Sequence, residues 1–171
     1  MTDTYAILTA NTVTAIRKAA SDLRAKHTDL LHGFALCTDD NVMTLYCVSC
    51  TKSWVSERKE KCEAIGYIDV DWEDDTGTNY FDNISNALAK LADNDSEAAC
   101  DGRFESLVEA LQQCRDEKLF DEETLLSCGS TDPSDHLEML QMRAVDRLNK
   151  PSVADEFAKH LGCEHHRESG G

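Results

Sequence analysis

Several features of membrane and secreted proteins are missing from this sequence. No stretch approaches the roughly 20 apolar residues of a membrane-spanning helix. The first residues lack the basic segment and the apolar run of a secretory signal peptide. Only two prolines are present, and no segment is repeated or of low complexity. We therefore expect a cytoplasmic protein of one domain, since 171 residues are enough for a core of ordinary size.

Basic residues are scarce as well. The chain has 17 lysines and arginines against 33 aspartates and glutamates, which gives a formal net charge of -16. Such a charge repels nucleic acid and anionic membranes and attracts a basic protein partner. The excess is localised, because residues 62–102 contain eleven acidic residues and only one basic residue, Lys90. A generic acidic surface with no specific partner is the alternative interpretation.

Motifs of hydrolytic and transfer enzymes are absent too. The chain has no G-x-S-x-G, no glycine-rich phosphate loop and no H-E-x-x-H. His27, His32 and His136 have no partner nearby in the sequence, although partners from distant segments stay open. We expect a protein that is not an enzyme and holds no cofactor.

The densest strand pattern lies at 33–49. Two arms rich in apolar, β-branched and aromatic residues flank the polar turn Asp39-Asp40-Asn41, which predicts a hairpin. Both faces of each arm are largely apolar, so we expect this hairpin to be covered on both sides in the middle of a sheet. Further strands are expected at 67–72 and 124–130.

Helical periodicity accounts for most of the remaining chain. We expect helices at 11–26, 51–65, 80–92 and 102–117, one after Asp132 as N-cap with Pro133 in its first turn, and a last one from Pro151 to Gly162. The predicted fold is α+β (or mixed α/β): a small, mostly antiparallel sheet of about four strands around the 33–49 hairpin, with about six helices. Residues 1–162 should form a single domain and residues 163–171 a flexible tail.

An acidic segment is the main candidate for partner binding. Because side chains alternate along a strand, two of its carboxylates share one face, and the loop that follows adds three more. Close carboxylates repel one another unless they stay solvated or meet a basic partner. The tryptophan among them is either an interface anchor or a core residue, and a solvated edge is the alternative for the whole segment. The candidate residues are Asp69, Asp71, Trp72, Glu73, Asp74 and Asp75.

Cysteine chemistry is the competing hypothesis. Cys47 and Cys50 form a C-x-x-C pair at the end of a predicted strand, but an antiparallel arm precedes them where a thioredoxin-like motif would follow a parallel unit. Cys163, His165 and His166 lie close together near the end of the chain and are potential zinc ligands. Buried, reduced core cysteines and a solvated tail are the simpler alternatives.

A family resemblance links these elements. The hairpin from Phe34 to Tyr46, the helix after it, the strand that ends in Trp72 and the stretch 120–132 resemble a bacterial family, the domain of unknown function 4303. The resemblance covers roughly residues 4–161. The chain departs from it at Trp72, because Asp71 stands where the family often has a basic residue.

The resemblance implies a small cytoplasmic domain, since some members of that family occur beside polymorphic or contact-delivered toxins and are interpreted as immunity proteins. We therefore expect an immunity protein that binds and neutralises a secreted antibacterial effector, a basic nuclease, through the acidic segment. Its partner would be that effector, with no nucleic acid and no membrane. A cysteine-dependent redox or zinc-binding protein and an accessory interaction domain without a toxin partner are the alternatives.

Overall fold

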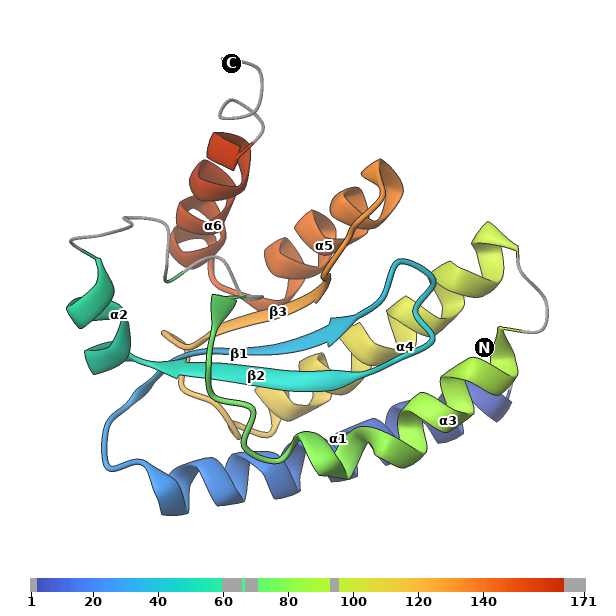
Figure 1. Ribbon diagram of the computed structural model, residues 1–171, viewed down its shortest axis with the longest axis horizontal. Coiled ribbons are helices and arrows are strands. Elements are labelled where there is room, and N and C mark those ends of the chain that lie inside the picture. Colours follow the sequence, from blue (N-terminus) through green and yellow to red (C-terminus); the bar gives the residue numbers. More distant parts are fainter. Residues whose placement is uncertain (1–2, 60–65, 67–70, 93–95, 165–171) are drawn as a thin grey trace.

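The computed structural model describes residues 3–59, 66, 71–92 and 96–164, with helices packed on both sides of a small sheet (Figure 1). Its elements are, in order, α1 (Asp3–Lys26), β1 (Leu31–Thr38), β2 (Tyr46–Thr51), α2 (Lys52–Arg58), the 3-10 helix η2 (Thr78–Phe81), α3 (Asp82–Leu91), α4 (Glu97–Asp116), β3 (Leu125–Ser130), α5 (Asp135–Leu148) and α6 (Pro151–Glu164). This order confirms the α+β class. No helix within these ranges combines the length and the apolar character needed to cross a membrane.

The sheet is mixed, with the strand order β2-β1-β3 in the part of the chain that the structure describes. The hairpin prediction is confirmed, because β1 and β2 pair antiparallel with Phe34 opposite Ser49. The described residues form three strands, fewer than the four or so expected, and the sheet is mixed instead of mostly antiparallel. β3 pairs parallel to β1, with Phe34 opposite Leu126. The helices between β2 and β3 supply the long crossover that parallel pairing requires.

The strand expected at 67–72 is not seen in the described residues. Residues 67–70 lie outside them, and neither Asp71 nor Trp72 belongs to a strand. The chain meets the edge of β2 at one isolated bridge, where the Ser49 N–H donates to the Asp74 carbonyl at 2.8 Å. The described residues from Asp71 to Gly77 therefore pass the edge of β2 as an irregular connection.

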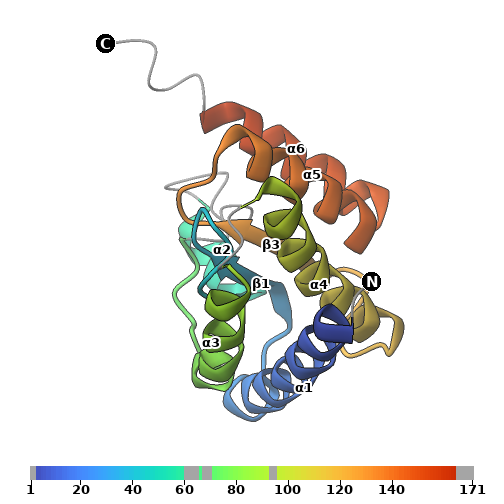
Figure 2. The ribbon, with the colours of Figure 1, turned by 90° about the vertical axis from the view of Figure 1, so that its right-hand side faces the viewer.

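Both faces of the sheet are covered by helices. Viewed from the side, α1, α3 and α4 lie on one face and α5 and α6 on the other (Figure 2). Every residue of β1 from Gly33 to Thr38 is buried, so the first arm of the hairpin is central as expected, whereas the second arm, β2, lies at the edge of the described sheet. On the first face Phe34 and Leu36 pack with Ile16 of α1 and Leu107 of α4.

On the second face the packing depends on one glycine. Trp72 is only 3% exposed and lies in a cluster with Ala35, Val48 and Phe157. A Cβ atom at Gly33 would lie 2.1 Å from Cη2 of Trp72, closer than any side chain can approach. The absence of a side chain at Gly33 makes room for the indole ring against the sheet.

Several helix boundaries differ from the predictions. α1 begins at Asp3, not at residue 11, and α4 begins at Glu97 instead of residue 102. The N-cap of α5 is Ser134, whose hydroxyl accepts from the Leu137 N–H at 3.3 Å, so Asp132 and Pro133 precede the helix instead of starting it.

Two further boundaries involve residues outside the description. The helix expected at 51–65 is observed as α2, Lys52–Arg58, and residues 60–65 are not described. α6 runs to Glu164, so Gly162 does not end it. Of the predicted tail, residues 165–171 lie outside the described residues.

Candidate functional site

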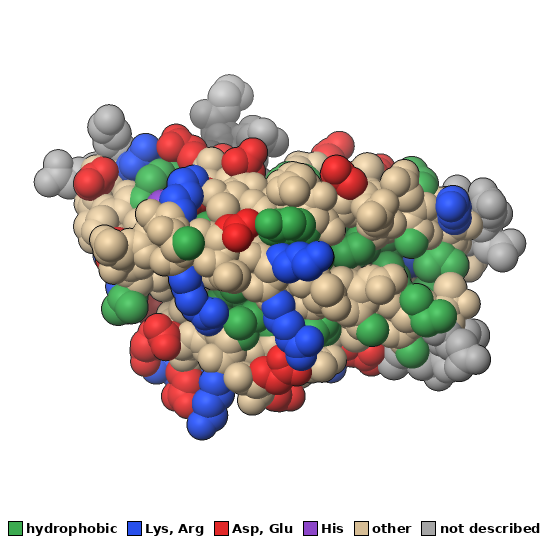
Figure 3. Space-filling model, turned by 90° about the horizontal axis from the view of Figure 1, so that it is seen from below, with side chains coloured by type: hydrophobic (Ala, Val, Ile, Leu, Met, Phe, Trp, Pro, Cys, Tyr) green, Lys and Arg blue, Asp and Glu red, His purple; other side chains and the backbone are tan. Residues whose placement is uncertain are grey.

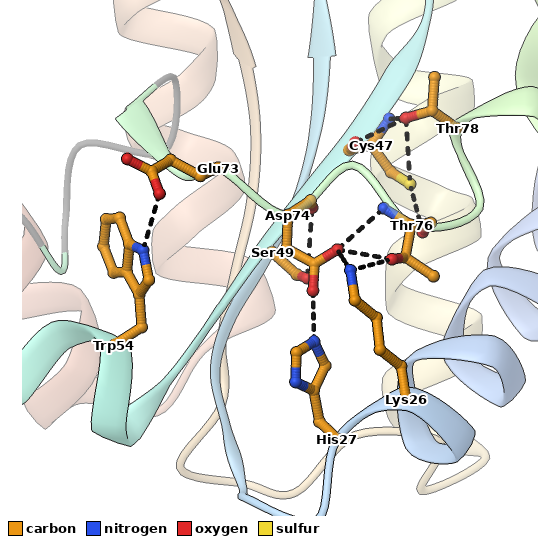
Figure 4. Close-up of polar contacts among 9 residues, drawn as sticks. All are labelled: Lys26, His27, Cys47, Ser49, Trp54, Glu73, Asp74, Thr76 and Thr78. Carbon is orange, nitrogen blue, oxygen red and sulfur yellow. Dashed lines mark hydrogen bonds and ion pairs between the residues drawn. The ribbon is translucent and has the colours of Figure 1, made fainter.

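The connection from Asp71 to Thr78 brings the edge of β2 close to the end of α1 (Figure 4). Asp74 is its central residue. One carboxylate oxygen accepts from Lys26 Nζ at 2.8 Å and from the hydroxyl of Thr76 at 2.6 Å. The other oxygen contacts Nε2 of His27. The end of α1 thus holds this connection in place through a partly buried ion pair.

The electrostatics of Asp74 follow from these contacts. Burial by itself would raise the pKa of its carboxyl, but the hydrogen bonds from Lys26, Thr76 and His27 outweigh burial and hold the pKa well below its ordinary range. The carboxylate is therefore ionised, and its charge is compensated within the protein. Asp74 was expected on an exposed acidic surface, whereas the structure uses it to anchor the connection.

The other candidate residues divide into two groups. Asp71, Glu73 and Asp75 are exposed and lie close together on the same connection. Trp72, between them, is buried against Gly33, so its ring offers no surface to a partner and packs in the core. Asp69 lies outside the described residues. Among the described residues, the predicted acidic surface thus has three exposed carboxylates, whose role in binding stays a prediction.

Trp54, which the sequence analysis did not select, lies beside these carboxylates. Its indole Nε1 donates to Oε2 of Glu73 at 3.4 Å. The guanidinium of Arg58 lies over the indole ring, 4.4 Å from its centroid, and one of its nitrogens is 3.1 Å from the same Glu73 oxygen. The spacing of Trp54 and Arg58, four residues apart on a helix, is the sequence signal that could have indicated this stack.

A pocket of about 210 Å³ opens between this group and Asp74. It is lined by Lys26, His27, Ser49, Cys50, Thr51, Trp54, Glu73 and Asp74. His27 also borders a pocket of about 320 Å³ between the end of α1 and the α4–β3 connection. The acidic connection therefore borders a concave surface with one aromatic side chain at its rim.

The His27–Asp74 pair resembles part of a hydrolytic triad, but the nearby hydroxyl does not complete it. Ser49 lines the same pocket and donates to the main-chain oxygen of Asp74 at 3.4 Å instead of to His27. Lys26 also pairs with the Asp74 carboxylate, at 2.8 Å. In the described ranges no group of three or more histidines, cysteines and acidic residues could hold a metal ion.

The C-x-x-C pair does not form a unit. Cys47 packs with the helices on one face of the sheet and Cys50 with Trp72 on the other, because residues three apart in a strand point in opposite directions. Burial raises the pKa of Cys47 to about 12, and the Thr78 hydroxyl only partly offsets this. A reactive thiol needs the opposite shift. The side chains of Cys163, His165 and His166 lie outside the described residues.

We predict that Cys47 and Cys50 resist alkylation in the folded protein. Brief treatment with iodoacetamide at pH 8 should modify the half-buried Cys100 before Cys47 and Cys50, because burial excludes the reagent from these two and keeps the Cys47 thiol protonated. Peptide mass spectrometry over a time course measures this. The same treatment in denaturant is the control, and Cys47 reacting as fast as Cys100 in the native protein would contradict the prediction.

The fold and the site define a class: a small α+β domain with a mixed sheet covered on both faces and an acidic connection along one sheet edge. The family follows from sequence comparison, in which the model of a domain of unknown function, DUF4303, matches residues 13–150. The chain belongs to this family. No curated protein and no solved structure matches it significantly.

Proposed function

We propose that this protein is a cytoplasmic immunity protein that binds and neutralises a secreted antibacterial effector, a basic nuclease, through its acidic surface. The observation that carries the proposal is the exposure of Asp71, Glu73 and Asp75 at the edge of β2 in a chain of net charge -16. A nuclease needs a basic surface to hold phosphates. An acidic inhibitor would be steered to that surface and would complement its charge.

The distribution of charge supports this choice of surface. On the face formed by α1 and α3, lysines and arginines are interspersed with the acidic side chains (Figure 3). On the connection beside β2, Arg58 and Lys26 pair with Glu73 and Asp74. Asp71 and Asp75 are exposed, and in the described part of the chain no ion pair involves them. These two carboxylates are therefore available to meet a basic partner.

The proposal is tested with the product of the adjacent gene. The triple variant Asp71→Asn, Glu73→Gln, Asp75→Asn should bind the adjacent gene product about tenfold more weakly. Each exposed charge pair at an interface contributes up to about 1 kcal/mol of binding free energy, and three such pairs are lost. The dependence of the affinity on salt should also become shallower. Calorimetry or surface plasmon resonance at two salt concentrations measures both effects.

A matched control separates the surface from the total charge. The variant Asp116→Asn, Glu122→Gln, Asp146→Asn makes the same change at exposed positions of other elements and should leave the affinity nearly unchanged. Equal losses in the two triple variants would contradict the acidic-surface mechanism. An adjacent product that does not bind at all would contradict the immunity assignment itself.

A further inference from the structure

We propose that Trp54 and Glu73 form a binding site for a guanidinium group, which Arg58 fills in the free protein and an arginine of the partner fills in the complex. The proposal rests on the proposed function for the identity of the partner as a basic protein. The site itself can be tested without that partner.

The three side chains already show how a guanidinium binds here. The Arg58 guanidinium lies over the Trp54 ring, 4.4 Å from its centroid, and reaches Glu73 at 3.1 Å. The indole N–H of Trp54 donates a hydrogen bond to the same carboxylate at 3.4 Å, and Figure 4 shows the Trp54 and Glu73 side chains pointing toward each other. An aromatic face beside a carboxylate suits the planar, delocalised charge of arginine better than the compact ammonium of lysine.

Arg58 is a replaceable occupant. Its side chain is 34% exposed and that of Glu73 is 67% exposed, so the ion pair between them is partly exposed to solvent. Exposed ion pairs contribute little to stability, and Arg58 comes from the last turn of a seven-residue helix. Glu57 also approaches the same guanidinium, at 3.9 Å, and offers it an alternative contact when it leaves Glu73.

The neighbouring pocket gives an incoming side chain room. Trp54 and Glu73 line this pocket together with Cys50 and Thr51, whereas Arg58 does not line it. The pocket therefore lies beside the position of the Arg58 guanidinium and gives the apolar stem of an incoming arginine room next to Trp54. Lys26 and His27 also line the pocket, but both pair with Asp74 and not with Glu73. Once Arg58 leaves, the Glu73 carboxylate is the uncompensated charge at this rim.

The test uses a blocked tripeptide with one arginine, acetyl-Gly-Arg-Gly-amide, at physiological salt. Binding is followed by the fluorescence of Trp54, since Trp72, the other tryptophan, is 3% exposed and should not respond. Arg58→Gln empties the site and keeps part of the side chain, so this variant should bind the peptide about two- to fivefold more tightly than the wild type. The same peptide with citrulline, which has no charge, should bind neither protein measurably.

Variants of Glu73 and Asp75 distinguish a specific guanidinium site from general electrostatic attraction. On the Arg58→Gln background, Glu73→Gln should abolish the gain, whereas Asp75→Asn removes one charge from the same connection and should preserve it. Equal effects of the two changes, or equal binding of the arginine and citrulline peptides, would overturn the proposal. Arginine-peptide binding that depends on Glu73 would support the guanidinium site even if no toxin partner exists. An affinity for the toxin that is unchanged in Glu73→Gln would contradict the use of this site in the complex, while the immunity function would stand.

Discussion

Replacing Trp72 by alanine should lower the free energy of unfolding by about 3–5 kcal/mol, the usual range for removing a buried aromatic side chain. The indole fills the space above Gly33 and packs on Val48 and Phe157, so its loss leaves a cavity on the second face of the sheet. Urea denaturation followed by circular dichroism measures the effect without depending on tryptophan fluorescence.

The second tryptophan provides the control. Trp54 is only partly buried at the protein surface, and its replacement by alanine should have a much smaller effect on stability. If Trp72→Ala kept its stability and lost partner binding, the residue would be an interface anchor and the core assignment would be wrong. The two variants therefore separate the structural tryptophan from the candidate binding one.

Replacing Arg115 by methionine should lower the free energy of unfolding by about 3 kcal/mol, because several oxygen atoms lose a charged donor. Arg115 donates to the carbonyl of Thr124 at 2.6 Å, to the carbonyl of Leu148 at 3.1 Å and to Oδ1 of Asn149 at 3.1 Å. Burial lowers the pKa of its guanidinium, and the negative charges of Glu122 and Asp121 only partly offset this. One side chain thus ties the end of α4 to the start of β3 and the end of α5.

Arg17 is the matched control for Arg115. It pairs with Glu117 at 2.7 Å on the protein surface, where solvent weakens the attraction, so Arg17→Met should change stability little. Thermal and urea denaturation of both variants give the comparison. Similar decreases in the free energy of unfolding for the two variants would show that the oxygens around Arg115 find other donors. That result would contradict the proposed role of Arg115 in linking α4, β3 and α5.

The sequence predicts the parts of this fold that depend on neighbouring residues. The 33–49 hairpin follows from two apolar arms and a polar turn, and the strand at β3 from a short run bounded by turn residues. The direction of β3 could not be predicted, because it depends on how the helices of the crossover pack. The early parts of α1 and α4 also depend on tertiary packing, since Leu8 of α1 belongs to the core and Cys100 of α4 packs against it.

The candidate site shows the same division. The exposure of Asp71, Glu73 and Asp75 follows from their polarity, but the partly buried ion pair of Asp74 does not. Its cationic partner Lys26 is 48 residues away in the sequence, and only the folded chain brings them together. Trp72 takes the core position, one of the two alternatives expected for it, because Gly33 opens a space for its ring. Trp54 lies beside Glu73 because α2 places it there.

The parallel pairing of β1 and β3 has a consequence for the order of events during synthesis. β2 leaves the ribosome soon after β1 and can pair with it at once, whereas β3 ends only at Ser130. Until then, the central strand of the finished sheet has one open edge on a nascent chain. Residues 62–102, the most acidic part of the protein, emerge during this interval. Their mutual repulsion and hydration would hold neighbouring nascent chains apart until that edge is closed.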